Sequence, residues 1–381
     1  MKIIRFVCVF MLIVITFTFT ASALEIKKVE LDLKVKSAVL MDALTGTVLY
    51  SKNMNDKLPP ASVTKIMTLL IVFEALESKK LTYDEEVVVS ENAASMGGSQ
   101  VYLEPGESMS VNELLKCVVI SSANDAAVTL AERVGGSVEA FVQMMNEKAK
   151  ELGMNNTYFE NVTGLDDNTN NHLTSAYDIA LMSKELLKYN KVTEYTTIWM
   201  DTIRNGEFGL SNTNRLIKYY KGATGLKTGY TSEAGFCLSA SAKRGDMHLI
   251  AVVMGADTSN ERNIAATKLL DFGFANYSIY KDAKNEYGTV KLLNGMKNEV
   301  LIGYDDFVAL ENLGNESKIE KEIIINDNVT APICAGDSVG RIVYKCNGNI
   351  IGEIPLIALE NVQEMKFFDY FVKSLQKFVL I

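Results

Sequence analysis

A change in hydrophobic pattern near Tyr280 is the feature that most restricts how this chain of 381 residues can fold. Before that point, apolar residues recur at helical spacing between shorter β-rich runs, which is typical of a domain that mixes helices and strands. After it, short apolar runs such as Val300–Ile302 and Ile354–Leu359 are separated by Asn, Gly and Asp. That texture is typical of a small all-β domain over 283–360. The sequence therefore predicts two domains of different class.

The first 23 residues have the form of a secretory leader. Lys2 and Arg5 precede a largely apolar run over 6–19, and the segment ends in Ala21-Ser22-Ala23. A short apolar core followed by small residues is typical of a signal peptide cleaved after Ala23. We therefore expect the protein to be exported and to act outside the cytoplasm, with its first folded domain over 24–280.

The last residues, 361–381, have the pattern of an amphipathic helix. Apolar side chains recur at three- and four-residue spacing from Met365 to Val379, while Lys366, Lys373 and Lys377 take other faces. Two interpretations fit this pattern: a helix docked on the protein's own core, or a helix lying in the plane of a membrane surface. Its place at the end of an exported chain favours the membrane-anchoring interpretation.

Composition excludes several classes of function. Lys and Arg number 38 against 47 Asp and Glu, for a net charge of −9, so a nucleic-acid-binding protein is not expected. The chain has only two histidines and no paired metal-ligand spacing, so we expect no metal and no cofactor. Five scattered cysteines do not form a disulfide framework, although Cys334 and Cys346 could pair within the β domain.

A serine and a lysine stand three residues apart in the short motif Ser62-Val-Thr-Lys65, directly after Pro59-Pro60. Apolar residues then follow at helical spacing from Ile66 to Leu76. A spacing of three on a helix puts both side chains on one face, so the Lys65 amine can lie beside the Ser62 hydroxyl. A serine becomes a good nucleophile when a neighbouring base takes its proton, and a lysine with a lowered pKa can be that base.

Two further motifs follow in order along the chain. Ser122-Ala-Asn124 precedes a predicted helix over 125–134 and offers a hydroxyl to relay a proton and a carboxamide to hold a peptide. Lys227-Thr228-Gly229 occurs once and leads into predicted strands over 237–242 and 247–254. Its lysine supplies positive charge, its threonine a hydroxyl, and its glycine space for a substrate backbone at an edge strand.

In this order, the three motifs resemble those of the serine penicillin-recognising enzymes, in particular the D-alanyl-D-alanine carboxypeptidases. Further stretches carry the resemblance, namely Gly164-Leu-Asp166, Thr174-Ser-Ala-Tyr-Asp178, Gly225-Leu-Lys-Thr-Gly-Tyr-Thr231 and Lys268-Leu-Leu-Asp-Phe-Gly-Phe274. The resemblance implies an α/β (α+β) transpeptidase-like fold, with an antiparallel sheet flanked by helices, plus the small C-terminal all-β domain. It also implies peptidoglycan stem peptides as substrates and β-lactam antibiotics as covalent inhibitors.

The resemblance also implies a role for each motif residue. Ser62 is the expected nucleophile and Lys65 its base, while the backbone N–H groups of Ser62 and Tyr230 form the oxyanion hole. Ser122 relays a proton to the leaving amine, and Asn124 holds the substrate peptide. The residues expected to contact the substrate near its terminal carboxylate and along the strand are Lys227, Thr228, Gly229, Tyr230 and Arg262.

One position departs from the family pattern. Thr213 stands between two asparagines where some relatives place an arginine, and Arg215 is offset from that position. A second contact to the substrate carboxylate is therefore not predicted. The resemblance does not decide which group is the base for deacylation. Lys65 is the leading candidate, and the sequence does not show where Asp166 lies relative to it.

Two other functions remain open at this stage. A class A β-lactamase uses the same three motifs, but it carries a Glu-x-x-Leu-Asn loop that does not occur between the second and third motifs here. A non-catalytic wall-binding module is the second alternative. It would have no reason to keep the nucleophile, the base and the other motif residues intact. Of the histidines, His248 is expected to be structural, and His172 lies in an Asn-rich loop that could border the cleft.

Overall fold

The computed structural model describes residues 29–165 and 169–372. The predicted leader, Asp166 and residues 373–381 of the predicted terminal helix lie outside these ranges. The described chain forms two compact units, a larger one over 29–280 with 310–316 and a smaller one over 281–309 with 317–372.

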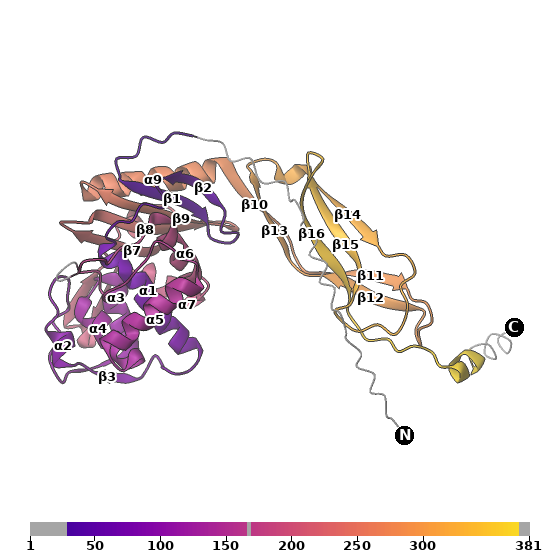
Figure 1. Cartoon of the computed structure of the whole chain (residues 1–381), viewed down its shortest axis with the longest axis horizontal. Helices are drawn as coiled ribbons and strands as arrows, with labels where there is room; N and C mark the ends of the chain where they lie inside the picture. The colour runs from indigo at the N-terminus through magenta and orange to yellow at the C-terminus, as the bar shows by residue number, and fades with distance from the viewer. Residues whose placement is uncertain (1–28, 166–168, 373–381) are drawn as a thin grey trace, which may run out of the picture. The chain divides into compact units, whose positions relative to one another are not determined.

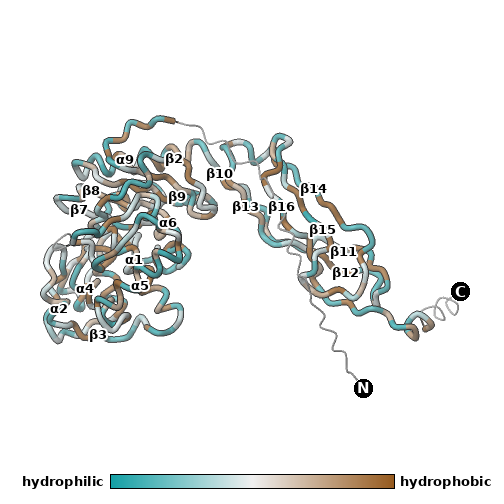
Figure 2. Tube along the Cα trace, viewed as in Figure 1, coloured by the Kyte–Doolittle hydropathy of each residue, from teal (hydrophilic) through white to brown (hydrophobic). Residues whose placement is uncertain are grey.

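An antiparallel five-stranded sheet forms the centre of the larger unit, in the order β2-β1-β9-β8-β7 (Figure 1). Its strands are β1 (Ser37–Asp42), β2 (Val48–Lys52), β7 (Ala223–Thr231), β8 (Gly235–Arg244) and β9 (Met247–Ala256). Helix α9 (Ser259–Asn276) lies on one face, and α6 (Ala176–Leu186) lies on the other (Figure 1). The central strand β9 is hydrophobic and buried along nearly its whole length, as expected for a strand covered on both faces (Figure 2). Strand β7 lies at the edge of the sheet, so only one of its sides pairs with another strand of this sheet.

A helical layer covers the α6 face of the sheet. It contains the 3₁₀ helix η1 (Ala61–Thr64), α1 (Lys65–Glu77), α2 (Glu91–Ala94), α3 (Val111–Ile120), α4 (Asn124–Gly135), α5 (Val138–Glu151) and α7 (Asn190–Thr196). Helix α1 is apolar on nearly every side, and only Glu74 and Glu77 escape burial, so it is the central helix of this layer. The predicted helix over 125–134 is confirmed as α4, which is followed by Gly136 in the left-handed conformation at φ 79°.

Short elements complete the larger unit. Two small antiparallel sheets of two strands each are formed by β3 (Glu86–Val88) with β4 (Ser108–Ser110) and by β5 (Met200–Ile203) with β6 (Phe208–Ser211). The unit also contains η2 (Arg204–Gly206) and α8 (Leu216–Tyr219). Strand β10 (Tyr277–Asp282) follows α9 and pairs with β13 (Phe307–Asn312).

The smaller unit is rich in β-structure. Its five-stranded sheet has the order β11-β12-β16-β15-β14, from β11 (Asn285–Lys291), β12 (Glu299–Tyr304), β14 (Ile319–Ile325), β15 (Ser338–Cys346) and β16 (Asn349–Ala358), and η3 (Glu316–Lys318) precedes β14. Cys334 is exposed and Cys346 buried, and both are present as thiols. Residues 367–372 are helical at the end of the described chain.

Candidate active site

The first motif begins the central helix of the larger unit. Ser62 lies in η1, one turn ahead of α1, and Lys65 is the first residue of α1. In a 3₁₀ helix the side chains at i and i+3 eclipse, so the motif's spacing brings the two groups directly together. Lys65 Nζ lies 3.0 Å from Ser62 Oγ, and the lysine is completely buried.

The second motif supplies a further partner of the same amine. Asn124 begins α4, and its Oδ1 lies 2.5 Å from Lys65 Nζ, while its Nδ2 donates to the Gly97 carbonyl at 2.6 Å. Ser122 is buried, and it adopts a left-handed conformation at φ 63°. Non-glycine residues rarely adopt this conformation, and strained residues of this kind cluster at functional sites.

The third motif lies on the edge strand β7. Lys227 is buried, and its Nζ donates to the Thr228 carbonyl at 3.0 Å. Thr228 Oγ1 donates to Thr213 Oγ1 at 2.7 Å, so the residue that departs from the family pattern contacts the third motif directly. Tyr230 is 57% exposed, and its ring packs on Phe236.

The sequence predicted that Gly229 leaves space for a substrate backbone. In the structure, Gly229 instead allows a close contact between β7 and η1. A β-carbon at this position would lie 2.9 Å from the Pro60 carbonyl oxygen and 3.0 Å from the Ser62 backbone nitrogen. The absence of a side chain therefore lets β7 approach η1, the segment that carries Ser62.

Burial and charge make Lys65 a base. Burial lowers the pKa of Lys65 well below its ordinary value, the positive charge of Lys227 lowers this pKa further, and Asp125 partly opposes both effects. The amine also lies at the N-terminal end of α1, where the helix dipole disfavours a cation. Both effects favour the unprotonated form of the Lys65 amine.

Arg262 on α9 is linked electrostatically to the third motif. Its guanidinium is buried, with its pKa lowered to about 10, and it lies over the Phe236 ring at 5.8 Å. Burial, together with the charge of Arg262, lowers the pKa of Lys227 to about 7. These two cations together favour an anion at this end of the site.

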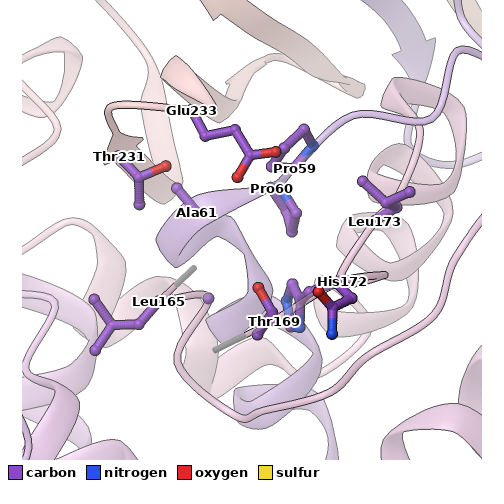
Figure 3. A pocket seen from close by; sticks show the side chains of 11 residues that line it. Pro59, Pro60, Ala61, Leu165, Thr169, His172, Leu173, Thr231 and Glu233 are labelled. Atoms are coloured by element: carbon purple, nitrogen blue, oxygen red, sulfur yellow. The ribbon is translucent and has the colours of Figure 1, made fainter. Parts of the chain in front are cut away.

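His172 borders the same region, beneath η1. Its Nδ1 accepts the Glu160 backbone N–H at 3.0 Å, so Nε2 carries the proton and donates to Thr64 Oγ1 at 2.8 Å. Burial lowers the pKa of His172 to about 4, which keeps the ring neutral at physiological pH. Figure 3 shows His172 in the wall of a small pocket beside Ala61. His248, by contrast, lies on β9, where its Nε2 is 2.9 Å from Thr224 Oγ1.

Three contributors to the site were missed by reasoning from sequence. The Thr163 carbonyl accepts from Lys65 Nζ at 3.0 Å, and the Gly97 carbonyl orients Asn124. Both are backbone atoms, which carry no residue-specific signal. Thr213, whose hydroxyl accepts from Thr228, was seen only as a departure from a pattern.

Comparisons with known proteins cover both units. A family model described as D-alanyl-D-alanine carboxypeptidase, peptidase S11, matches residues 22–258, and one described as the C-terminal domain of penicillin-binding protein 5 matches residues 274–364. The D-alanyl-D-alanine carboxypeptidase DacF of Bacillus subtilis is 46% identical over 353 residues, covering 91% of this chain and 90% of the relative. DacC of Escherichia coli is 37% identical over 341 residues, covering 87% and 84%.

Solved structures match the fold as well. Penicillin-binding protein 5 of Haemophilus influenzae matches with a TM-score of 0.76 at 31% identity, covering 89% of this chain and 100% of that structure. Penicillin-binding protein 6B of Escherichia coli matches with a TM-score of 0.71 at 31% identity, covering 88% and 98%.

Proposed function

The chain belongs to the peptidase S11 family of serine-type D-alanyl-D-alanine carboxypeptidases, and from this premise we propose which of its residues perform the reaction. The enzyme removes the terminal D-alanine from peptidoglycan stem peptides and binds penicillin. This activity makes the β-lactamase and the non-catalytic module the weaker interpretations.

One observation supports Ser62 as nucleophile and Lys65 as its base. An unprotonated amine has two N–H groups and one lone pair. The carbonyl oxygens of Asn124 and Thr163 can only accept hydrogen bonds, so they take both N–H groups of Lys65. Ser62 Oγ is the remaining neighbour, 3.0 Å from Lys65 Nζ. In this proposal the lone pair of the unprotonated amine accepts the Ser62 hydroxyl proton.

The reaction proceeds in two halves. Lys65 takes the hydroxyl proton as Ser62 Oγ attacks the carbonyl carbon of the penultimate D-alanine, and the backbone N–H groups of Ser62 and Tyr230 stabilise the oxyanion. The C–N bond then breaks, Ser122 relays a proton to the departing amine, and D-alanine leaves. Water hydrolyses the resulting ester and restores Ser62.

The other motif residues bind the substrate in this proposal. Asn124 holds the peptide, and Gly229 and Tyr230 lie along it on the edge strand. Lys227, Thr228 and Arg262 bind near the terminal carboxylate, because two buried cations and a hydroxyl suit an anion. Arg215 has no place in this proposal.

The test measures D-alanine released from a diacyl-Lys-D-Ala-D-Ala peptide by the purified chain, beside its Ser62→Ala variant. Release by the parent and none by the variant is expected, together with covalent labelling by fluorescent penicillin that the variant loses. Labelling that persists in a folded Ser62→Ala variant contradicts the assignment of the nucleophile.

The domain assignments extend this proposal to the rest of the chain. Residues 1–23 are the leader, 24–280 the catalytic domain and 283–360 the β-rich domain. The family's action on peptidoglycan places the enzyme outside the cytoplasm. Its location is then the outer face of the cytoplasmic membrane or the cell wall.

Residues 361–381 anchor the enzyme at a membrane surface. In the described part of this segment, Phe367, Phe368 and Phe371 are 88%, 72% and 55% exposed, which is unusual for aromatic side chains in a helix docked on its own protein. None of the helices within 29–165 and 169–372 is both long enough and apolar enough to cross a bilayer. An amphipathic helix can instead lie in the interface.

Sedimentation with vesicles containing anionic lipid tests the anchor. The chain should sediment with the vesicles, and a chain ending at residue 366, just before the helix begins, should stay in solution while still releasing D-alanine. A Phe368→Ser, Phe371→Ser double variant that binds as well as the parent would rule out aromatic insertion.

A further inference from the structure

A pocket lies beside the segment that carries Ser62, on the described part of the chain. Three segments of the described chain meet there: the residues leading into η1, the end of β7 with the turn that follows it, and residues within 164–165 and 169–173. The pocket is lined by Pro59, Pro60, Ala61, Leu173, Thr231 and Glu233, among others. In Figure 3, Thr231 and Glu233 face Thr169 and His172 across this space.

The direction of β7 places the pocket along the substrate. In the proposed function, the terminal carboxylate lies near Lys227 and Thr228, and the attacked carbonyl lies at the Tyr230 N–H. A peptide paired with this edge strand advances about 3.3 Å per residue. The residue before the D-Ala-D-Ala pair therefore lies beyond Tyr230, next to Thr231 and Glu233.

The lining combines apolar surface with one carboxylate. Pro59, Pro60 and Leu173 offer apolar surface along which methylene groups can pack. Glu233 is exposed. It is the one lining residue among those described that carries a charge, since the His172 ring is neutral. In stem peptides the residue before D-Ala-D-Ala is a diamino acid, which has an aliphatic side chain ending in an amine.

We propose that Glu233 is a specificity-determining residue whose carboxylate binds the distal ammonium group of that diamino acid. This inference rests on the proposed function and deepens it. A stem peptide whose distal amine is free would then be preferred over one whose amine is acylated, as it is in a cross-link. Acylation removes the charge and lengthens the side chain, so the contact with Glu233 is lost.

The test compares two substrates with the full chain in detergent. One is Nα-acetyl-Lys-D-Ala-D-Ala, with a free ε-amine, and the other is its Nα,Nε-diacetyl form. The parent should show a kcat/KM about fivefold higher for the free amine, as expected for a partly exposed ion pair. In Glu233→Gln this ratio should fall towards one, and in Glu233→Lys it should reverse. High salt should weaken the parent's preference.

A matched control uses Glu77→Gln. Glu77 is exposed at the other end of α1, 12 residues from Lys65 and about 18 Å along the helix axis. This variant should keep the parent's substrate ratio.

The inference is overturned if the parent shows no preference, or if Glu233→Gln keeps the parent's ratio. Failure of the proposed function looks different, since neither substrate would then release D-alanine and penicillin would not label Ser62. Penicillin labelling of each Glu233 variant also shows that the variant is folded.

Discussion

Gly229 of the edge strand packs against Ser62 so closely that a β-carbon at position 229 would lie 3.0 Å from the Ser62 backbone nitrogen. The third motif therefore positions the first, besides facing the substrate. Because Ser62 N–H is one of the two proposed oxyanion donors, this contact sets the distance between the donors on η1 and on β7.

Gly229→Ala should slow acylation while leaving the protein folded. The new methyl group must push η1 and β7 apart by a few tenths of an ångström, since both neighbours are backbone. A displacement of catalytic groups on this scale costs about tenfold or more in rate. The measurement is the rate of penicillin labelling. Gly209→Ala on β6, where a β-carbon meets nothing within 4 Å, is the control and should label at the parent's rate.

The pH dependence of acylation should depend on Lys227. Acylation needs Lys65 unprotonated, so its rate rises with pH through the lowered pKa of Lys65. Lys227→Gln removes a charge that holds this pKa down, so the pKa of Lys65 rises. The acid limb of the labelling rate should then move to higher pH. Lys150→Gln, on an exposed face of α5, should leave the limb in place, and an unmoved limb in Lys227→Gln contradicts the coupling.

Arg262→Gln should weaken binding of substrates that end in a carboxylate. Loss of a charge-assisted contact costs about 1.5–3 kcal/mol, which corresponds to a rise in KM of about tenfold or more. The same change removes a charge that lowers the pKa of Lys227, so that pKa should rise. Steady-state kinetics on the diacyl peptide measures KM and kcat separately. A loss confined to kcat, with KM unchanged, would argue against a role in binding.

Acid should destabilise the larger unit through His172. Its pKa falls from 6.5 unfolded to about 4 folded, so between these values the unfolded chain binds more protons. Stability from the neutral ring is present above pH 6.5 and is lost as the pH falls towards 4, by on the order of 3 kcal/mol. His172→Gln keeps a donor for Thr64 and does not titrate. Its unfolding free energy, from urea melts, should fall less between pH 7 and 4 than that of the parent.

The pairing of Ser62 with Lys65 could be predicted from the sequence because it depends only on the spacing of residues within one segment. The three-residue interval between Ser62 and Lys65 predicted a shared face, although the segment is 3₁₀ at Ser62 rather than α-helical. The predicted helices over 66–76 and 125–134 are confirmed as the bodies of α1 and α4. The match with the peptidase S11 family confirms the activity that the ordered motifs indicated.

The state of Lys65 was decided only by the tertiary structure. Its acceptors, Asn124 and the Thr163 carbonyl, are 59 and 98 residues away in sequence, and Lys227 lies on the edge strand β7. A lysine becomes a base when water is excluded and a second cation is near, and both conditions arise only when distant segments pack. The sequence determined which groups are present and in what order. Packing determined that the Lys65 amine is buried, has a lowered pKa and lies 3.0 Å from the Ser62 hydroxyl.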